Sequence, residues 1–218
     1  MKLPDSPART SRLGRLAGLY AIVGGPDPVA QAALALDGGA AVIQLRVKEM
    51  ADGELLAAAS RLVALARGRA LVIVNDRADL AVLSGADGVH VGDEDLPVEA
   101  ARRVVGPGLL VGRSTRTLAD GLAALAAGAD HVGFGPVFAT ATKRIAEPPR
   151  GLAMLAEVAR GLPAPVVAIG GIGLETIGPV AAAGAAAAAV IGALFDGPDP
   201  RRRAAALAAA FAAGRATP

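Results

Sequence analysis

Three polar residues stand at alternate positions of an otherwise apolar run: Gln44, Arg46 and Lys48. Alternate residues of an extended strand point to the same side, so we expect these side chains to face one site together. A guanidinium can hold two phosphate oxygens at once, and an ammonium adds a point charge. The spacing therefore predicts an anion site, which we favour over the alternative that these cations pair with Glu49 or a neighbouring strand.

The residue types of this motif are scarce elsewhere in the chain. Most positive charges are carried by Arg, so a Lys suggests a position where a compact ammonium is wanted. The chain's lysines, asparagine and glutamines are Lys2, Lys48, Lys143, Asn75, Gln31 and Gln44.

Two carboxylates follow consecutive predicted strands, Asp76 after residues 70–75 and Asp95 after residues 88–91. Two oxygen donors of this kind suit Mg²⁺, which keeps several waters and bridges substrate phosphates. The alternative is that each Asp caps the following helix. Capping competes more strongly for Asp95, because Pro97 stands close behind it.

Two further segments carry groups that can hold an anion. After Gly133, Gly135 and Pro136 break a short apolar run, Thr140, Thr142 and Lys143 follow in a loop. Glycines at 170, 171 and 192 follow the last two apolar runs, and glycine lets backbone N–H groups approach a phosphate. A glycine pair alone more often marks only a turn.

The two histidines, His90 and His131, lie inside strand patterns. We interpret each as a satisfied core or rim residue rather than a catalytic base, although His often serves acid–base roles. The sequence shows no Ser-His-Asp arrangement and no metal-binding pair of histidines.

Eight short apolar runs alternate with helical segments and so bring these residues together. The runs are continuous rather than alternating, as in parallel strands covered on both faces. Eight such units predict an α/β (β/α)8 TIM barrel, whose active site lies at the carboxyl ends of its strands. The absence of a Gly-x-Gly-x-x-Gly motif after the first run weakens a dinucleotide-binding fold. The predicted strands are residues 19–23, 41–46, 70–75, 88–91, 109–112, 131–134, 165–169 and 187–191.

The chain of 218 residues predicts one domain. We expect a loose, Arg-containing lead-in at residues 1–17 and a single barrel domain at residues 18–214. No linker that is long or polar enough to divide the chain is present.

Composition excludes several classes of function. Cysteine is absent, which excludes disulfides, thiolate metal sites and cysteine nucleophiles. The net charge of +2 and the 2% of aromatic residues argue against a nucleic-acid partner. The longest apolar stretch, residues 181–194, is too short to span a bilayer, and no export signal is seen, so we expect a cytoplasmic protein without a membrane partner. The sequence leaves open whether copies of the chain associate.

Taken together, these segments resemble the thiamine phosphate synthase family, in the family's order and over nearly the whole chain after the lead-in. The matching segments are QLRVK at 44–48, VNDRADL at 74–80, GVHVG at 88–92, EDLP at 94–97, GRS at 112–114, GFGPVF at 133–138, TATK at 140–143 and IGGI at 169–172.

This resemblance implies a TIM-barrel transferase of thiamine biosynthesis with Mg²⁺ as cofactor. It would condense 4-amino-2-methyl-5-(diphosphooxymethyl)pyrimidine with 4-methyl-5-(2-phosphooxyethyl)thiazole, giving thiamine phosphate and diphosphate. Asp76 and Asp95 would hold the metal, and Ser114 and Lys143 would be catalytic. The pyrimidine diphosphate would bind to Gln44, Arg46, Lys48, Asn75, Ser114 and Lys143, and the thiazole phosphate to Thr140, Thr142, Gly171, Ile191 and Gly192.

Four positions depart from the resembled pattern. Ala139 stands where Pro is usual and His131 where Tyr is common. Asp93 replaces a frequent Gln, and Gly192 stands where a Ser often contributes a hydroxyl.

Two alternatives share the expected barrel. A thiazole tautomerase-like isomerase would carry a His in place of Pro136 and an incomplete diphosphate-binding set. A non-catalytic barrel that binds thiazole or thiamine phosphates need not keep Asp76, Asp95 and Lys143 together. An unrelated phosphosugar isomerase would need a base at the barrel mouth, and none stands out.

Overall fold

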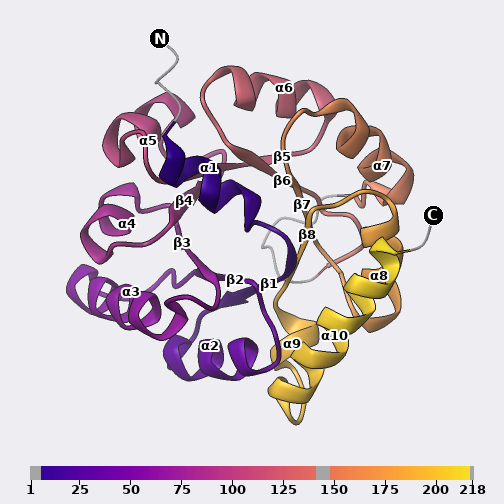
Figure 1. Cartoon of the computed structure of the whole chain (residues 1–218), viewed down its shortest axis with the longest axis horizontal. Helices are drawn as coiled ribbons and strands as arrows, with labels where there is room; N and C mark the ends of the chain where they lie inside the picture. The colour runs from indigo at the N-terminus through magenta and orange to yellow at the C-terminus, as the bar shows by residue number, and fades with distance from the viewer. Residues whose placement is uncertain (1–5, 141–147, 217–218) are drawn as a thin grey trace.

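The computed structural model describes residues 6–140 and 148–216 and contains a closed barrel of eight parallel strands (Figure 1). Each strand pairs with the next along the chain, and β1 pairs with β8 to close the ring. This confirms the predicted (β/α)8 architecture. The strands are β1 Gly18–Val23, β2 Val42–Leu45, β3 Leu71–Asn75, β4 Gly88–Val91, β5 Leu110–Thr115, β6 His131–Phe134, β7 Val166–Ile169 and β8 Ala187–Val190.

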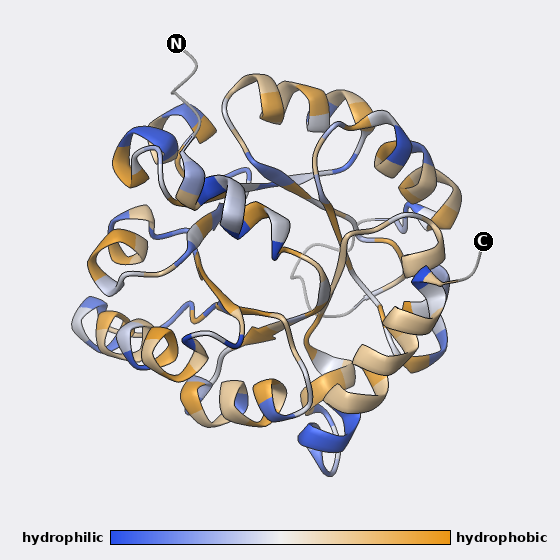
Figure 2. Cartoon of the chain, viewed as in Figure 1, coloured by the Kyte–Doolittle hydropathy of each residue, from blue (hydrophilic) through white to orange (hydrophobic). Residues whose placement is uncertain are grey.

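Helices surround the barrel and follow the strands in alternation (Figure 1). Most strands are drawn in apolar colours in Figure 2, whereas the helices carry both apolar and hydrophilic residues. None of the described helices combines the length and hydropathy that crossing a membrane requires. The helices are α1 Pro7–Gly14, α2 Pro28–Asp37, α3 Asp52–Ala66, α4 Ala78–Ser84, α5 Val98–Val105, α6 Leu118–Ala126, α7 Gly151–Gly161, α8 Leu174–Ala182, α9 Gly192–Phe195 and α10 Pro200–Arg215.

The apolar core has two parts. The larger part lies between the strands and the helices, and the smaller part fills the barrel interior. Inside the barrel, bulky residues such as Leu71, Ile73 and Leu110 are buried together with Tyr20. The inward positions of β8 carry only Ala187 and Ala189. Such small side chains leave space inside the ring.

The prediction of a loose lead-in was wrong for Pro7–Gly14, which forms helix α1. Pro7 opens the helix, where its fixed backbone angle is already suitable. Arg12 Nε donates to Asp87 Oδ1 at 2.9 Å, and Leu13 and Leu16 pack against the barrel-interior cluster. Arg9 and Arg12 of this segment pair with Asp130 and Asp87, carboxylates at the amino ends of strands.

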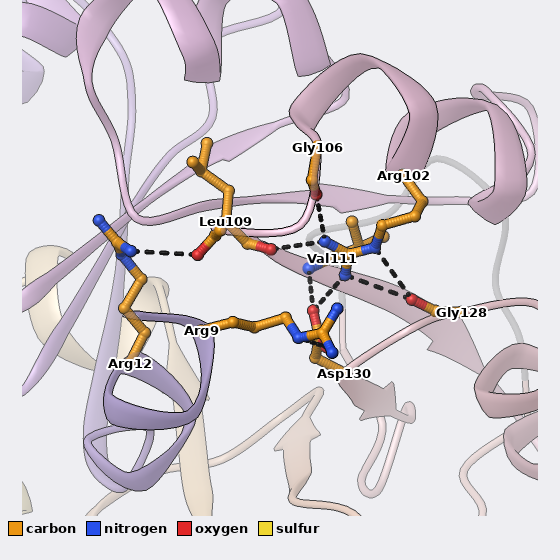
Figure 3. A network of polar contacts seen from close by, with 9 residues as sticks. Arg9, Arg12, Arg102, Gly106, Leu109, Val111, Gly128 and Asp130 are labelled. Atoms are coloured by element: carbon orange, nitrogen blue, oxygen red, sulfur yellow. Dashed lines mark hydrogen bonds and ion pairs between the residues drawn. The ribbon is translucent and has the colours of Figure 1, made fainter. Parts of the chain in front are cut away.

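A network of polar contacts ties this end of the barrel together (Figure 3). Arg102 is buried; its guanidinium forms an ion pair with Asp130 and donates to the carbonyls of Leu109 at 2.6 Å and Gly106 at 2.9 Å. Asp130 Oδ2 also accepts from the backbone N–H of Val111 at 2.8 Å, and Arg9 lies 3.5 Å from Asp130 Oδ1. The charged groups of this network thus stabilise the fold at the amino ends of the strands, on the side of the barrel opposite the carboxyl ends.

Candidate active site

A cavity of about 470 Å³ opens at the carboxyl ends of the strands. Its lining comes from loops and strand ends all around the barrel, as the sequence analysis expected of an active site. The predicted site residues that line it are Gln44, Arg46, Asn75, Ser114, Thr140, Gly171, Ile191 and Gly192.

The remaining predicted residues fall into two groups. Lys48, Asp76 and Asp95 are described but do not line this cavity. Thr142 and Lys143 lie outside the described residues, so their placement stays a prediction.

Only part of the Gln44, Arg46 and Lys48 motif lies in a strand. Strand β2 ends at Leu45, so Gln44 is buried inside the barrel and Arg46 follows the strand's end. Both line the cavity. Lys48 lies in the loop that follows Arg46 and is exposed, yet its positive charge still lowers the pKa of Asp76. The cations therefore lie on one side of the mouth, next to a carboxylate.

Asp76 and Asp95 form a carboxyl pair at that side. Burial raises the pKa of Asp76 to about 7, helped by the hydrogen-bonding contact with Asp95 and by its negative charge. The charges of Arg46 and Lys48 oppose this shift of the pKa but do not cancel it. A cation bound between the carboxylates of Asp76 and Asp95 would relieve the repulsion between their negative charges.

The backbone holds both carboxylates in place independently of any helix cap. Asp76 has a left-handed φ of 65°, which is uncommon for residues other than glycine, and its N–H donates to the carbonyl of His90 at 2.8 Å. Asp95 Oδ2 accepts from the N–H of Gly92 at 2.7 Å. The residues that precede α4 and α5 are Arg77 and Pro97, and neither helix start has a side-chain cap. The capping alternative for the two aspartates is therefore wrong.

The donor set suits Mg²⁺. Both candidate ligands are oxygens, and Mg²⁺ is commonly held by one or two carboxylates while waters and substrate phosphates complete its shell. No group of three or more His, Cys, Asp or Glu side chains gathers within residues 6–140 and 148–216 to form a denser metal site.

The glycine-rich side of the cavity is made by the loops after β6 and β7. Val137 N–H donates to the Ile169 carbonyl at 2.9 Å, and Phe138 N–H donates to the Gly170 carbonyl at 3.0 Å. Gly171 has a φ of 63°, and a Cβ there would lie 2.4 Å from the Ala139 carbonyl oxygen. Glycine is thus required by both conformation and space, and the two loops pack as one unit beneath the mouth.

Asp196 lines the same side and was not foreseen from the sequence. It follows the short helix α9, and its Oδ2 lies 2.5 Å from where a Cβ on Gly192 would stand. A carboxylate here opposes anion binding, so the phosphate site expected at Gly192 carries a negative neighbour. An Asp in a loop gives no sequence signal of this contact.

Deep in the cavity, Gln44 Nε2 donates to the Tyr20 hydroxyl oxygen at 2.8 Å, and both side chains are buried. Burial raises the pKa of Tyr20 strongly, while the hydrogen bond from Gln44 opposes the rise, so the phenol stays protonated. Sequence reasoning missed Tyr20 because it lies within an apolar strand pattern.

The histidines lie on the opposite wall. His90 Nε2 is 3.0 Å from Ser114 Oγ. His131 is wholly buried, and burial, helped by His90, lowers its pKa to about 3, so it is neutral. His131 was predicted to be a satisfied core or rim residue, but both of its ring nitrogens lack a hydrogen-bond partner among the described residues.

Ion pairs at the rim account for one departure from the resembled pattern. Arg113 Nη2 and Arg116 Nη1 donate to the two oxygens of Asp93, at 2.8 Å and 2.5 Å. A glutamine at position 93 would offer only one acceptor oxygen and no charge. Asp93 and the two arginines therefore form one matched set.

Comparisons with known proteins point to thiamine phosphate synthases. A family model described as thiamine monophosphate synthase matches residues 19–194. A thiamine-phosphate synthase of Anaeromyxobacter dehalogenans is 62% identical over 216 residues, covering 99% of this chain and 97% of that protein. A thiamine-phosphate synthase of Myxococcus xanthus is 52% identical over 188 residues, covering 86% of each.

Among solved structures, a thiamine phosphate pyrophosphorylase from Pyrococcus furiosus superposes with a TM-score of 0.82 at 34% identity, covering 92% of this chain and 98% of that one. A 3-hexulose-6-phosphate synthase superposes with a TM-score of 0.66 at 23% identity, over 88% of this chain and 99% of that one. The second likeness concerns the fold alone.

Proposed function

This chain belongs to the thiamine monophosphate synthase family, and from that premise we propose how its cavity performs the synthase reaction. The chain is a transferase of thiamine biosynthesis. In the proposed reaction the pyrimidine diphosphate and the thiazole phosphate react in the presence of Mg²⁺, and thiamine phosphate and diphosphate leave.

The observation that carries this proposal is the division of the mouth into two anion-binding sides. On one side Arg46 and Lys48 lie near the carboxyl pair of Asp76 and Asp95. On the other side the lining is glycine backbone around Gly171 and Gly192. A diphosphate has more charge to neutralise than a monophosphate, so we assign it to the cationic side.

The reaction breaks the bond between the pyrimidine methyl carbon and the diphosphate oxygen, which keeps the electron pair. The thiazole nitrogen then donates its lone pair to that carbon to form the new bond, and the positive charge passes to the thiazolium ring. Mg²⁺ bound by Asp76 and Asp95 would supply charge neutralisation for the diphosphate as it departs. This chemistry requires no strong base, which agrees with the neutral His131.

The side chains of the chain bind and orient the two reactants. Arg46 and Lys48 would hold the diphosphate oxygens, with Lys143 joining them from the loop after β6. Gln44 and Asn75 line the cavity and would bind the pyrimidine, and Ser114 would lie beside the reacting carbon. Thr140 and Thr142, together with the backbone near Gly171, Ile191 and Gly192, would hold the thiazole phosphate.

The alternatives are not favoured. Pro136 lines the cavity where the tautomerase-like isomerase would carry a His. A silent binding barrel would have no use for two carboxylates crowded enough to raise a pKa to about 7.

The test is a two-substrate assay with the purified chain. We expect equal amounts of thiamine phosphate and diphosphate with Mg²⁺, and neither product after chelation. Arg46→Ala should lower turnover sharply. The matched control Arg69→Ala, which removes an exposed ion pair with Asp37, should not. Substrate binding without product in the presence of Mg²⁺ would overturn the proposal and favour a binding protein.

A further inference from the structure

The hydroxyl of Ser114 has two states, and the difference between them matters for the reaction. Its oxygen lies 3.0 Å from His90 Nε2 and lines the cavity. If Nε2 is bare, the hydroxyl proton points at His90. If Nε2 carries a proton, the oxygen accepts from His90 and the hydroxyl proton is left to point into the cavity.

The choice between these states is made at the other ring nitrogen of His90, because a neutral imidazole carries one proton. His90 Nδ1 lies 2.6 Å from the position that a Cβ on Gly112 would occupy. His131 Nε2 lies 2.3 Å from the same position. Both nitrogens therefore border the gap left by Gly112, and the ring centroids are 6.0 Å apart.

His131 lacks any other partner in the described part of the chain. It is wholly buried, and neither of its ring nitrogens makes a hydrogen bond. A buried polar group without a partner is costly, so a neutral His131 gains if its N–H turns toward a nearby acceptor. His90 Nδ1 is such an acceptor, and glycine at position 112 leaves the rings room to tilt together.

We propose that His131 is a positioning residue that fixes the tautomer of His90 and thereby directs the hydroxyl proton of Ser114 into the cavity. His131 Nε2–H faces His90 Nδ1, His90 Nε2–H donates to Ser114 Oγ, and Ser114 donates to the substrate. Each side chain therefore donates to the next, from His131 through His90 to Ser114. The role of Ser114 toward substrate rests on the proposed function, whereas the tautomer of His90 does not.

The decisive measurement is nitrogen-15 NMR of the tag-free chain labelled at histidine, without substrate and near neutral pH. The sequence contains only two histidines, so His131→Phe leaves the His90 signals alone in the spectrum. We expect His90 to be protonated at Nε2 in the parent chain and to shift toward the Nδ1-protonated form in His131→Phe. Nδ1 protonation of His90 in the parent, or an unchanged His90 in the variant, would overturn the proposal.

Two further variants separate positioning from packing. His131→Tyr keeps a ring and an O–H donor, so it should retain the Nε2-protonated His90, and it serves as the test if His131→Phe does not fold. Val132→Ala removes a wholly buried neighbour on the same strand and should lower stability without changing the His90 signals.

Turnover provides the second readout. His131→Phe should lower kcat about tenfold, the effect of one hydrogen bond, with little change in KM for the thiazole phosphate. In a Ser114→Ala background the same substitution should have almost no further effect, because the two residues act in series. If the losses of kcat from His131→Phe and Ser114→Ala add up in the double variant, the proposal that the two residues act in series is overturned. If the parent chain shows no turnover, the proposed function fails, while the NMR result still decides the tautomer.

Discussion

At the scale of single residues, the site depends on side chains whose usual ionisation the fold has changed. Asp76 is held near Asp95 with a pKa raised to about 7, and His131 is held neutral with a pKa lowered to about 3. The sequence placed Asp76 after a predicted strand and His131 inside one. It could not show the pKa values, because these depend on burial and on partners distant in the sequence, such as Asp95 for Asp76.

The carboxyl pair predicts a specific loss of metal binding. Asp76→Asn removes one anionic ligand, so we expect Mg²⁺ affinity in the presence of the pyrimidine diphosphate to fall by about tenfold or more, which corresponds to about 1.4 kcal/mol. Calorimetric titration measures it. Asp79→Asn, an exposed aspartate that pairs with Arg77, is the control and should bind Mg²⁺ as the parent does. Equal affinity in Asp76→Asn would remove Asp76 from the metal site.

His131 predicts an acid-side loss of stability. In the unfolded chain a His binds a proton near pH 6.5, but the folded His131 does so only near 3. Below pH 6.5 the unfolded state therefore gains protons that the folded state does not, and stability falls by about 1.4 kcal/mol per pH unit toward pH 3.

Denaturant unfolding of the parent chain and of His131→Phe, followed from pH 7 to 4.5, checks this prediction. The variant should lack this part of the slope. Parallel pH dependences in the two chains would show that His131 does not resist protonation in the fold.

Asp196 predicts an unusual gain of affinity. It lies against Gly192 on the side assigned to the thiazole phosphate and is exposed. Asp196→Asn removes a like charge, so we expect the dissociation constant for the thiazole phosphate to fall about threefold, a change of well under 1 kcal/mol. Asp37→Asn, an exposed aspartate in an ion pair with Arg69, is the matched control. Weaker binding in Asp196→Asn would mean that this carboxylate takes part in binding.

At the scale of elements, strand positions were predictable and their ends were less so. The strands were found because continuous apolar runs need burial on both faces. Strand β2 stops at Leu45, which puts Lys48 beyond the reach of the alternation argument, and β5 continues to Thr115, which keeps Ser114 within the sheet. Helix α1 was missed because its cohesion comes from ion pairs with carboxylates far along the chain.

One buried arginine holds several elements together and predicts a contrast within one helix. Arg102 binds the end of α5, the start of β5 and Asp130, and its removal takes the buried cationic donor away from Asp130 and from the carbonyls of Gly106 and Leu109. We expect Arg102→Ala to lower the free energy of unfolding by about 3–5 kcal/mol. Arg103→Ala, an exposed neighbour, should change it by less than about 0.5 kcal/mol. Similar denaturation curves for both variants would contradict the structural role of the network.

At the scale of the whole molecule, the barrel keeps stability and chemistry at opposite ends. Leu16 lies in the interior cluster and is 2% exposed, far along the barrel from the mouth. Leu16→Ala should lower the free energy of unfolding by about 2–5 kcal/mol through the cavity it leaves. Both KM values should stay unchanged at temperatures where the variant remains folded.

The control is Leu83→Ala, because Leu83 is 68% exposed and loses little on truncation. A change of KM in Leu16→Ala would show that packing at the amino end of the barrel reaches the site. The (β/α)8 fold was predictable at this scale because eight consistent units leave few ways to pair, whereas the carboxylate of Asp196 in the lining depends on loop geometry that no local pattern specifies.

Helix α1 and the apolar interior beneath the cavity have a consequence for the order of events. With Leu13 and Leu16 packed against the interior at the amino end, the cavity is a dead end. Two reactants and two products must then pass through the same opening, so binding and release follow an order. Whatever sits deepest arrives first and departs last. The pyrimidine diphosphate, whose pyrimidine is assigned to the bottom of the cavity near Gln44, would bind first. The diphosphate at the rim would be free to leave before thiamine phosphate.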